Sequence, residues 1–197
     1  MLQATIIVSH ACCRRSGGAH PFNQVVESIH IIMNMLKIFR FLVHAPLGIY
    51  IGVFLLSSFL LQVPFIFSDW YADEDFQNPM VDSLEEGGKT LVLYYSVIFA
   101  PLIETFVVQF SVIKLFRLIT KKAILTLAIA VPLSAILFSL LHTYSPYYMM
   151  ITFFMGYSMG VAFFIGMYRK DWPAFMLVVM IHSAWNLLVF ILHEIGG

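Results

Sequence analysis

The chain has 197 residues, of which 60% are hydrophobic and 11% charged, whereas soluble domains carry about 25% charged residues. Lysine and arginine together number 11, as do aspartate and glutamate, and no basic stripe interrupts the sequence. This composition excludes an ordinary soluble domain and a nucleic-acid-binding surface. The two cysteines, Cys12 and Cys13, are adjacent, so they have the spacing of neither a disulfide framework nor a metal site.

Residues 1–34 differ from the rest of the chain. The apolar stretch before Arg14 is too short for a signal-peptide core and has no positive region before it. Met33 and Met35 directly precede Leu36, where a membrane protein would naturally start. We expect residues 1–34 to be a poorly structured tail, or the product of a start codon placed too far upstream.

Apolar segments dominate the remainder. A helix needs about 20 apolar residues to cross the hydrocarbon core. Five windows of this kind follow one another: 45–67, 90–113, 123–142, 147–167 and 174–193. The sequence therefore predicts an all-α, polytopic membrane helix bundle of five transmembrane helices. We expect residues 35–89 to hold the first helix and an acidic external loop, and residues 90–197 to form a four-helix core.

Charges in the connections predict the orientation. All lysines and arginines except Lys89 lie before the first window or in two of the connections: Arg14, Arg15, Lys37, Arg40, Lys114, Arg117, Lys121, Lys122, Arg169 and Lys170. By the positive-inside rule these regions are cytoplasmic. The 68–89 connection is acidic and belongs outside. The sequence predicts an N-in/C-out integral membrane protein, located in the plasma (inner) membrane if the source is bacterial.

Small and aromatic residues near the windows have structural interpretations. Gly156 and Gly160 form a Gly-x-x-x-Gly pattern, which lets helix backbones approach closely. We expect this pattern to serve internal packing, with a dimer face as the alternative. Tyr147 and Tyr148 lie at a span end, where we expect them to anchor the helix at the membrane interface.

Polar residues inside the apolar windows are the most informative feature of the chain. Glu104 lies well inside the second window, and an ionisable residue at that depth costs at least about 2.5 kcal/mol, so it marks function by default. Phe138 and His142 are four residues apart and share a helix face, as do His182 and Asn186. We expect Glu104, His142 and His182 to partner one another across three helices.

Several interpretations of this cluster stay open. The cluster could be purely structural, with Asn186 bonding between helices. It could serve a small transporter with Glu104 as a proton relay, although no pair of matching interrupted spans is visible. One glutamate and two histidines also form a known three-ligand zinc set.

The same residues carry a resemblance to a known family. The chain resembles the CAAX protease and bacteriocin-processing (CPBP, or Abi) intramembrane endopeptidases over about residues 95–193. Their motifs run Glu-Glu-x-x-x-Arg, Phe-x-x-x-His and His-x-x-x-Asn/Asp, each in its own helix. The second motif matches at Phe138 and His142, and the third at His182 and Asn186.

The first motif departs from the family pattern. Glu104 and its Ala100–Ile103 lead-in match, but Thr105 replaces the second glutamate and Gln109 replaces the arginine. We expect these departures to affect positioning, because the group that activates water is retained.

The resemblance implies that residues 90–197 form a CPBP-like catalytic core of an intramembrane endopeptidase. Its substrate would be a membrane-associated or lipid-modified peptide, and its partners the lipid bilayer and that substrate. Carried over, Glu104 activates water with His142, while His182 and Asn186 stabilise the oxyanion. No cofactor is implied. The alternatives are a non-catalytic membrane adaptor or immunity-type protein that retained the fold, and a zinc-dependent version of the same hydrolase.

The depth of His142 conflicts with this arrangement. At about 1.5 Å per residue, Glu104 lies ~15 Å from the cytoplasmic end of its window and His142 ~30 Å from that of its own. We expect either a kink at Pro132 or an interfacial course for residues 121–131 to remove the difference.

Overall fold

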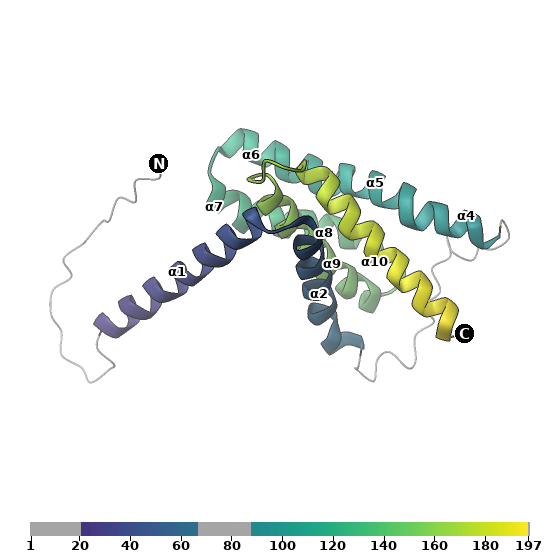
Figure 1. Ribbon diagram of the computed structural model, residues 1–197, viewed down its shortest axis with the longest axis horizontal. Helices are drawn as coiled ribbons and strands as arrows, with labels where there is room; N and C mark the ends of the chain where they lie inside the picture. Colours follow the sequence, from purple (N-terminus) through teal and green to yellow (C-terminus); the bar gives the residue numbers. More distant parts are fainter. Residues whose placement is uncertain (1–20, 67–87, 197) are drawn as a thin grey trace. The chain divides into compact units, whose positions relative to one another are not determined.

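The computed structural model describes residues 21–66 and 88–196, and within these ranges the chain is helical, with turns and no strand (Figure 1). In these two ranges, five helices are long and apolar enough to cross a membrane: Leu47–Pro64, Lys89–Thr120, Ala123–Leu140, Pro146–Gly166 and Ala174–Leu192. The predicted all-α bundle with five spans is therefore confirmed. Residues 1–20 and the acidic stretch 67–87 lie outside the described residues.

The N-terminal helix begins earlier than the sequence predicts. Helix α1 runs from Pro21 to His44, so the boundary expected at residue 34 falls inside a helix. The chain divides into two compact units, residues 1–38 and 39–197. The predicted polar cluster lies entirely in the second unit.

Within the second unit, α2 (Leu47–Ile66) is followed by one long helical run and then by shorter elements. The long run consists of α4 (Lys89–Tyr94), η2 (Tyr95–Phe99), α5 (Ala100–Glu104), η3 (Thr105–Ile113) and α6 (Lys114–Thr120). It is succeeded by α7 (Ala123–Leu125), η4 (Thr126–Ala130), α8 (Val131–Leu140), α9 (Pro146–Gly166) and α10 (Ala174–Gly196). The elements η2, η3 and η4 are π-helical, with wider turns than an α-helix.

Two of these π-helical segments end just before a proline. η2 is followed by Pro101, and η4 by Pro132. Proline has no N–H to donate, and its ring clashes with the carbonyl of the fourth residue before it. A wider turn at that point accommodates the ring, so each apolar helix continues past its proline instead of ending there.

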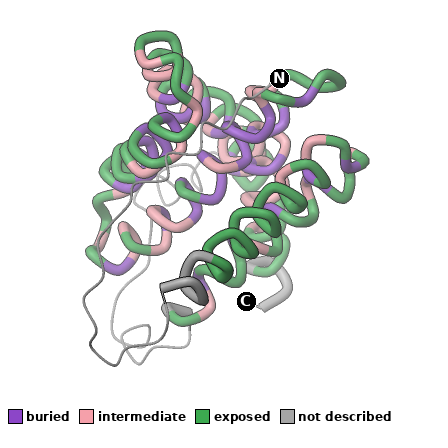
Figure 2. Tube along the Cα trace, turned by 90° about the vertical axis from the view of Figure 1, so that its left-hand side faces the viewer, coloured by how far each residue is buried: buried purple, intermediate pink, exposed green. Residues whose placement is uncertain are grey.

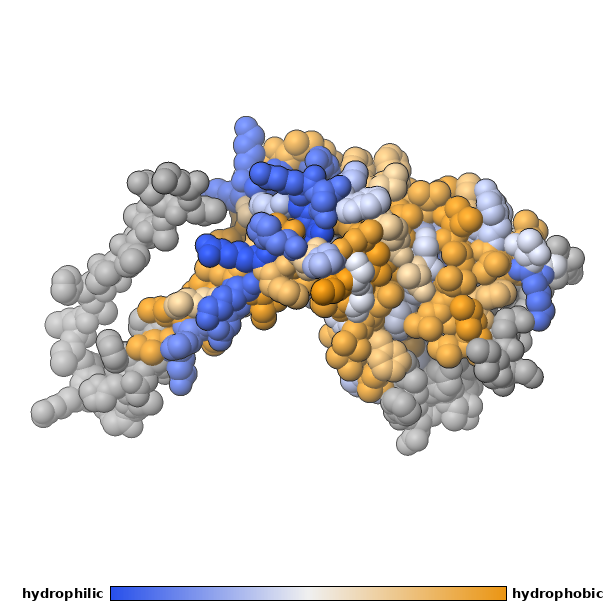
Figure 3. All heavy atoms as spheres, viewed as in Figure 1, coloured by the Kyte–Doolittle hydropathy of each residue, from blue (hydrophilic) through white to orange (hydrophobic). Residues whose placement is uncertain are grey.

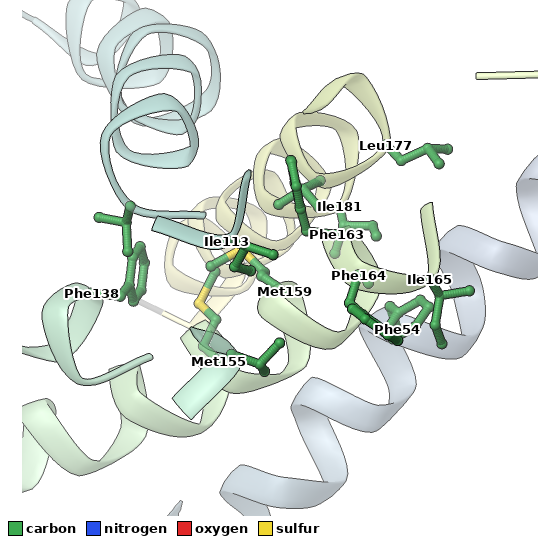
Figure 4. Close-up of a cluster of buried hydrophobic side chains, with 14 of the residues drawn as sticks. Phe54, Ile113, Phe138, Met155, Met159, Phe163, Phe164, Ile165, Leu177 and Ile181 are labelled. Carbon is green, nitrogen blue, oxygen red and sulfur yellow. The ribbon is translucent and has the colours of Figure 1, made fainter. Parts of the chain in front are cut away.

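Helix α9 lies at the centre of the bundle and packs against α8, α10, α2 and η3. Of its span, 61% is buried inside the protein, against 22 to 39% of the other four. Figure 2 shows buried residues along the inner faces of the helices and exposed residues along the outer faces. In Figure 4, Met155 and Met159 of α9 lie beside Ile113 of η3, with Phe138 of α8 to one side of them.

The two α9 glycines face α8. A Cβ added to Gly156 would lie 3.0 Å from the Phe138 side chain, and one added to Gly160 would lie 3.0 Å from Val131. Such close approach requires glycine at both positions. The predicted role of the Gly-x-x-x-Gly pattern in internal packing is thereby confirmed.

The surface of the second unit is largely apolar. In Figure 3 hydrophobic atoms cover most of the visible face, and hydrophilic atoms gather near the end where α6 and α7 lie. At that end Lys114 and Arg169 line one pocket, and Arg169 also contacts the carbonyls of Leu42 and Ala45. Two of the basic segments that the sequence assigns to one side of the membrane, those of Lys114 and Arg169, therefore meet at one end of the bundle.

Candidate active site

The structure brings the three ionisable residues of the predicted cluster together. Glu104 ends α5, and its Oε2 lies 3.9 Å from His142 Nε2 and 3.7 Å from His182 Nε2. Direct hydrogen bonds of this type span about 2.7–3.2 Å, so both separations exceed a direct bond. The Glu104 side chain keeps 24% of its surface exposed, so that water can reach the carboxylate.

The conflict over depth does not arise in the structure, where Glu104 and His142 lie close together, and the second helix is longer than the sequence predicts. It continues to Thr120 instead of ending near residue 113, which adds about 10 Å at 1.5 Å per residue. Glu104 consequently lies farther from that end of the bundle. His142, two residues beyond the end of α8, reaches the same level.

His142 is held by its own helix end. Its Nδ1 donates a hydrogen bond to the Phe138 carbonyl at 2.8 Å, and the two rings lie 4.7 Å apart. Burial lowers the pKa of His142 below that of a free histidine, against a smaller opposing effect of this hydrogen bond. A neutral ring whose Nδ1 carries the proton has Nε2 as an acceptor, and Nε2 is the atom that faces Glu104.

α10 contributes the other two members of the cluster. His182 is almost fully buried, its ring lies 5.6 Å from that of Phe138, and its Nδ1 has no hydrogen-bond partner within the described residues. Asn186, one turn later, donates from Nδ2 to the Ser96 carbonyl at 2.7 Å. This bond joins α10 to η2, and it leaves the second N–H of the Asn186 amide for another acceptor.

The two departures from the family motif are buried beside the site. Thr105 and Gln109 follow Glu104 in η3, and neither side chain is exposed to solvent. Within residues 21–66 and 88–196, the Thr105 hydroxyl and both amide atoms of Gln109 have no hydrogen-bond partner. Because threonine and glutamine are uncharged, neither position forms an ion pair with Glu104.

The sequence interpretation missed one neighbour of the site and misread another aromatic residue. The Tyr148 ring lies 5.8 Å from the ring of His142, although its position at a span end indicates an interfacial anchor. A short turn from His142 to α9 was the signal that these rings meet. The expectation for Tyr147 is wrong, because its side chain is 1% exposed and lies in the core.

Comparison with known proteins gives one match. The family profile described as type II CAAX prenyl endopeptidase Rce1-like matches residues 86–188, more than half of the chain. The matched region contains all five residues of the predicted constellation: Glu104, Phe138, His142, His182 and Asn186. No curated protein and no solved structure matches the chain.

Proposed function

Since the chain belongs to the Rce1-like family of type II CAAX prenyl endopeptidases, we propose that it hydrolyses a peptide bond of a membrane-associated or lipid-modified peptide within the bilayer. The observation that carries this proposal is the position of the Glu104 carboxylate between two histidine Nε2 atoms at 3.7 and 3.9 Å. Polar groups separated by more than about 3.5 Å suit a bridging water. That water is the nucleophile of the proposed reaction.

Glu104 is the general base in this mechanism. It removes a proton from water while the water oxygen attacks the peptide carbonyl carbon, and the carbonyl electron pair moves to its oxygen. His142 Nε2 accepts a hydrogen bond from the same water, since Nδ1 already donates to Phe138. When the C–N bond breaks, Glu104 returns its proton to the leaving amine.

His182 and Asn186 are the oxyanion donors from α10. His182 lies against Phe138 in a dry environment, where a donor aimed at a developing charge is stronger than in water. Asn186 offers the N–H that is not bonded to Ser96. Because His182 Nε2 must then carry a proton, the role requires the tautomer in which Nδ1 does not.

A non-catalytic adaptor or immunity-type protein is the second candidate, favoured by the replacement of the family Glu and Arg with Thr105 and Gln109. The zinc-dependent version uses the same three side chains as ligands. Among the described residues no group of histidine, cysteine and carboxylate side chains is arranged as a metal site, and we propose the mechanism without a metal.

The experiment that tests the proposal uses the purified protein in lipid nanodiscs with a prenylated CAAX peptide. We expect the wild type to release the C-terminal fragment and Glu104→Gln to release none. Glu27→Gln, which changes an exposed acid of α1, is the control. Absence of cleavage by the wild type would contradict the proposal and favour the adaptor. Equal cleavage by Glu104→Gln would exclude Glu104 as the general base.

We further propose the N-in/C-out orientation, because Lys114 of α6 and Arg169 of the α9–α10 connection line one pocket at one end of the bundle. Single cysteines at Lys121 and Thr143, introduced after replacing Cys12 and Cys13, should react with an impermeant thiol reagent on opposite sides. We expect Thr143→Cys to react in intact cells and Lys121→Cys after permeabilisation. The reverse result would invert the topology.

A further inference from the structure

Tyr148 lies beside the candidate active site without a role in the mechanism described so far. Its ring lies 5.8 Å from the ring of His142, whose Nε2 lies 3.9 Å from Glu104 Oε2. The neighbouring Tyr144 ring lies 5.5 Å from Tyr148 but is 43% exposed. Of these two tyrosines, Tyr148 has its ring closer to His142 and is the less exposed.

The backbone of Tyr148 is fixed on both sides. Ser145 caps α9 and its hydroxyl accepts a hydrogen bond from the Tyr148 N–H at 3.1 Å. One turn later the Thr152 hydroxyl donates to the Tyr148 carbonyl at 2.9 Å. These bonds fix the point at which the Tyr148 side chain leaves α9, and the adjacent rings of His142 and Tyr144 restrict the side chain itself, which is the condition for a preorganised donor.

The Tyr148 hydroxyl is also uncommitted. It makes no hydrogen bond to the part of the chain that the structure describes, whereas His142 donates from Nδ1 to Phe138 and Asn186 donates from Nδ2 to Ser96. A phenol that is largely buried usually finds a partner for its hydroxyl. The rings that the structure places beside Tyr148 are those of Tyr144 and of His142, a member of the candidate site.

We propose that the Tyr148 hydroxyl donates a hydrogen bond to the oxyanion of the tetrahedral intermediate, from the α9 side of the site. This inference rests on the proposed peptidase function. His182 and Asn186 approach the same oxygen from α10, so donors on two helices hold the negative charge between them. Tyr148 remains protonated throughout, and the proton of the attacking water goes to Glu104.

A purely structural role for Tyr148 makes a different prediction. Packing against His142 depends on the ring, which phenylalanine retains, whereas donation to an oxyanion depends on the hydroxyl. Tyr148→Phe therefore separates the two roles. Tyr144→Phe is the matched control, because the Tyr144 ring belongs to the same aromatic group, 6.4 Å from His142.

The test measures kcat and KM of wild type, Tyr148→Phe, Tyr144→Phe and Glu104→Gln on one prenylated peptide in nanodiscs. We expect kcat to fall about 100-fold to 1,000-fold in Tyr148→Phe, as on removal of other oxyanion donors. KM and the melting temperature should stay at their wild-type values, and Tyr144→Phe should behave as wild type. Binding of a phosphinate analogue of the peptide, which mimics the tetrahedral anion, should weaken by a similar factor.

Each alternative outcome is distinct. An active wild type with an inactive Glu104→Gln and an unaffected Tyr148→Phe would overturn the role of Tyr148 and leave the peptidase function standing. A rise in KM alone, with unchanged phosphinate binding, would overturn it too, because Tyr148 would then bind the substrate in its ground state. A wild type without activity would overturn the proposed function and this inference together.

Discussion

Two clusters of charged side chains lie within this apolar protein, and they are built differently. In the first, which we name the Arg169 cluster, the guanidinium of Arg169 donates to the carbonyls of Leu42 and Ala45, both at 2.7 Å, and pairs with Asp171 at 2.5 Å. Its plane also lies 4.7 Å from the Tyr50 ring centroid.

The Arg169 cluster satisfies the end of a helix. The last carbonyls of an α-helix have no partner within the helix, and α1 ends at His44. Arg169 binds one of these orphan acceptors, the Leu42 carbonyl, and also the carbonyl of Ala45 just after the helix. Its charge suits the negative end of the helix dipole. Only 1% of the Arg169 side chain is exposed, and four hydrogen bonds from its guanidinium hold it in place.

The Glu104 site shows the opposite arrangement. The separations of 3.7 and 3.9 Å around Glu104 exceed direct bonds, and His182 Nδ1 has no partner within the described residues. A cluster held together by direct hydrogen bonds stabilises the fold. A cluster whose donors and acceptors lie beyond direct bonding distance is able to bind a reacting molecule. Substitutions in the Arg169 cluster should therefore lower the stability of the protein, and substitutions in the Glu104 site should lower its activity.

Glu104→Gln should have the largest effect, and on activity alone. Loss of a general base lowers kcat by about 100-fold to 10,000-fold, while glutamine preserves the shape of the side chain. We expect an unchanged melting temperature in nanodiscs. If the variant unfolds or retains full activity, Glu104 has a structural role and not a catalytic one.

Arg169→Leu should act in the reverse way. Two buried carbonyls would lose their donors, and we expect the free energy of unfolding to fall by about 2–4 kcal/mol. Lys170→Leu, at the exposed neighbouring position, is the control and should change little. The measurement is thermal unfolding in nanodiscs, with kcat at a temperature where both variants are folded. A large loss of kcat with wild-type stability would contradict the comparison.

Gly156→Ala tests whether packing behind the site controls its geometry. The new Cβ would lie 3.0 Å from Phe138, whose carbonyl orients His142. A displacement of a few tenths of an ångström should lower kcat roughly 10-fold, since about 1 Å can cost 100-fold. Gly160→Ala is equally tight against Val131 but lies away from the site, so its kcat should stay near the wild-type value. An equal loss of kcat in both variants would refute a specific effect of the Gly156–Phe138 contact on the site.

Asp171 should give a small effect that depends on pH. Its hydrogen bonds with Arg169 hold the pKa of Asp171 below the usual range, so the folded protein binds that proton less readily than the unfolded chain. The contribution to stability is present above about pH 4 and is lost as the pH falls through the lowered pKa. Between pH 5 and pH 3 the melting temperature of Asp171→Asn should change less with pH than that of the wild type. If the melting temperature of the variant falls at acid pH as much as that of the wild type, the pairing of Asp171 with Arg169 does not contribute to stability.

Chelation should have no effect. If Glu104 and His142 act on water directly, treatment with EDTA and gel filtration leaves kcat unchanged. Stoichiometric zinc in the purified protein, with activity lost on chelation and restored by zinc, would replace the metal-free mechanism with the zinc-dependent one.

The sequence predicted the helices well because apolar length is a direct physical requirement of the bilayer. Its pairing of Glu104 with the two histidines agrees with the observed distances, although their catalytic roles stay predictions. The depth conflict arose because the second helix was expected to end near its first lysine, Lys114, whereas it continues to Thr120. Charge marks the limit of a membrane window, and the hydrogen-bonded helix extends beyond it.

Sequence patterns did not predict the contacts between segments that are far apart in the chain. Arg169 was interpreted as a loop cation, and no local pattern indicates that it caps α1 more than 120 residues earlier. Tyr148 was interpreted as an interfacial anchor from its position at a span end. Both residues acquire their surroundings through tertiary packing, which periodicity and composition do not specify.

The most direct test of the central claim, that Glu104 delivers an activated water, is a single turnover in H₂¹⁸O. With the enzyme in excess over a prenylated peptide, mass spectrometry of the new C-terminal carboxylate should find one ¹⁸O atom in every product molecule. Cleavage without ¹⁸O in the first turnover would mean that Glu104 attacks the carbonyl itself and forms an anhydride. That result, or the absence of any cleaved product, would contradict the account.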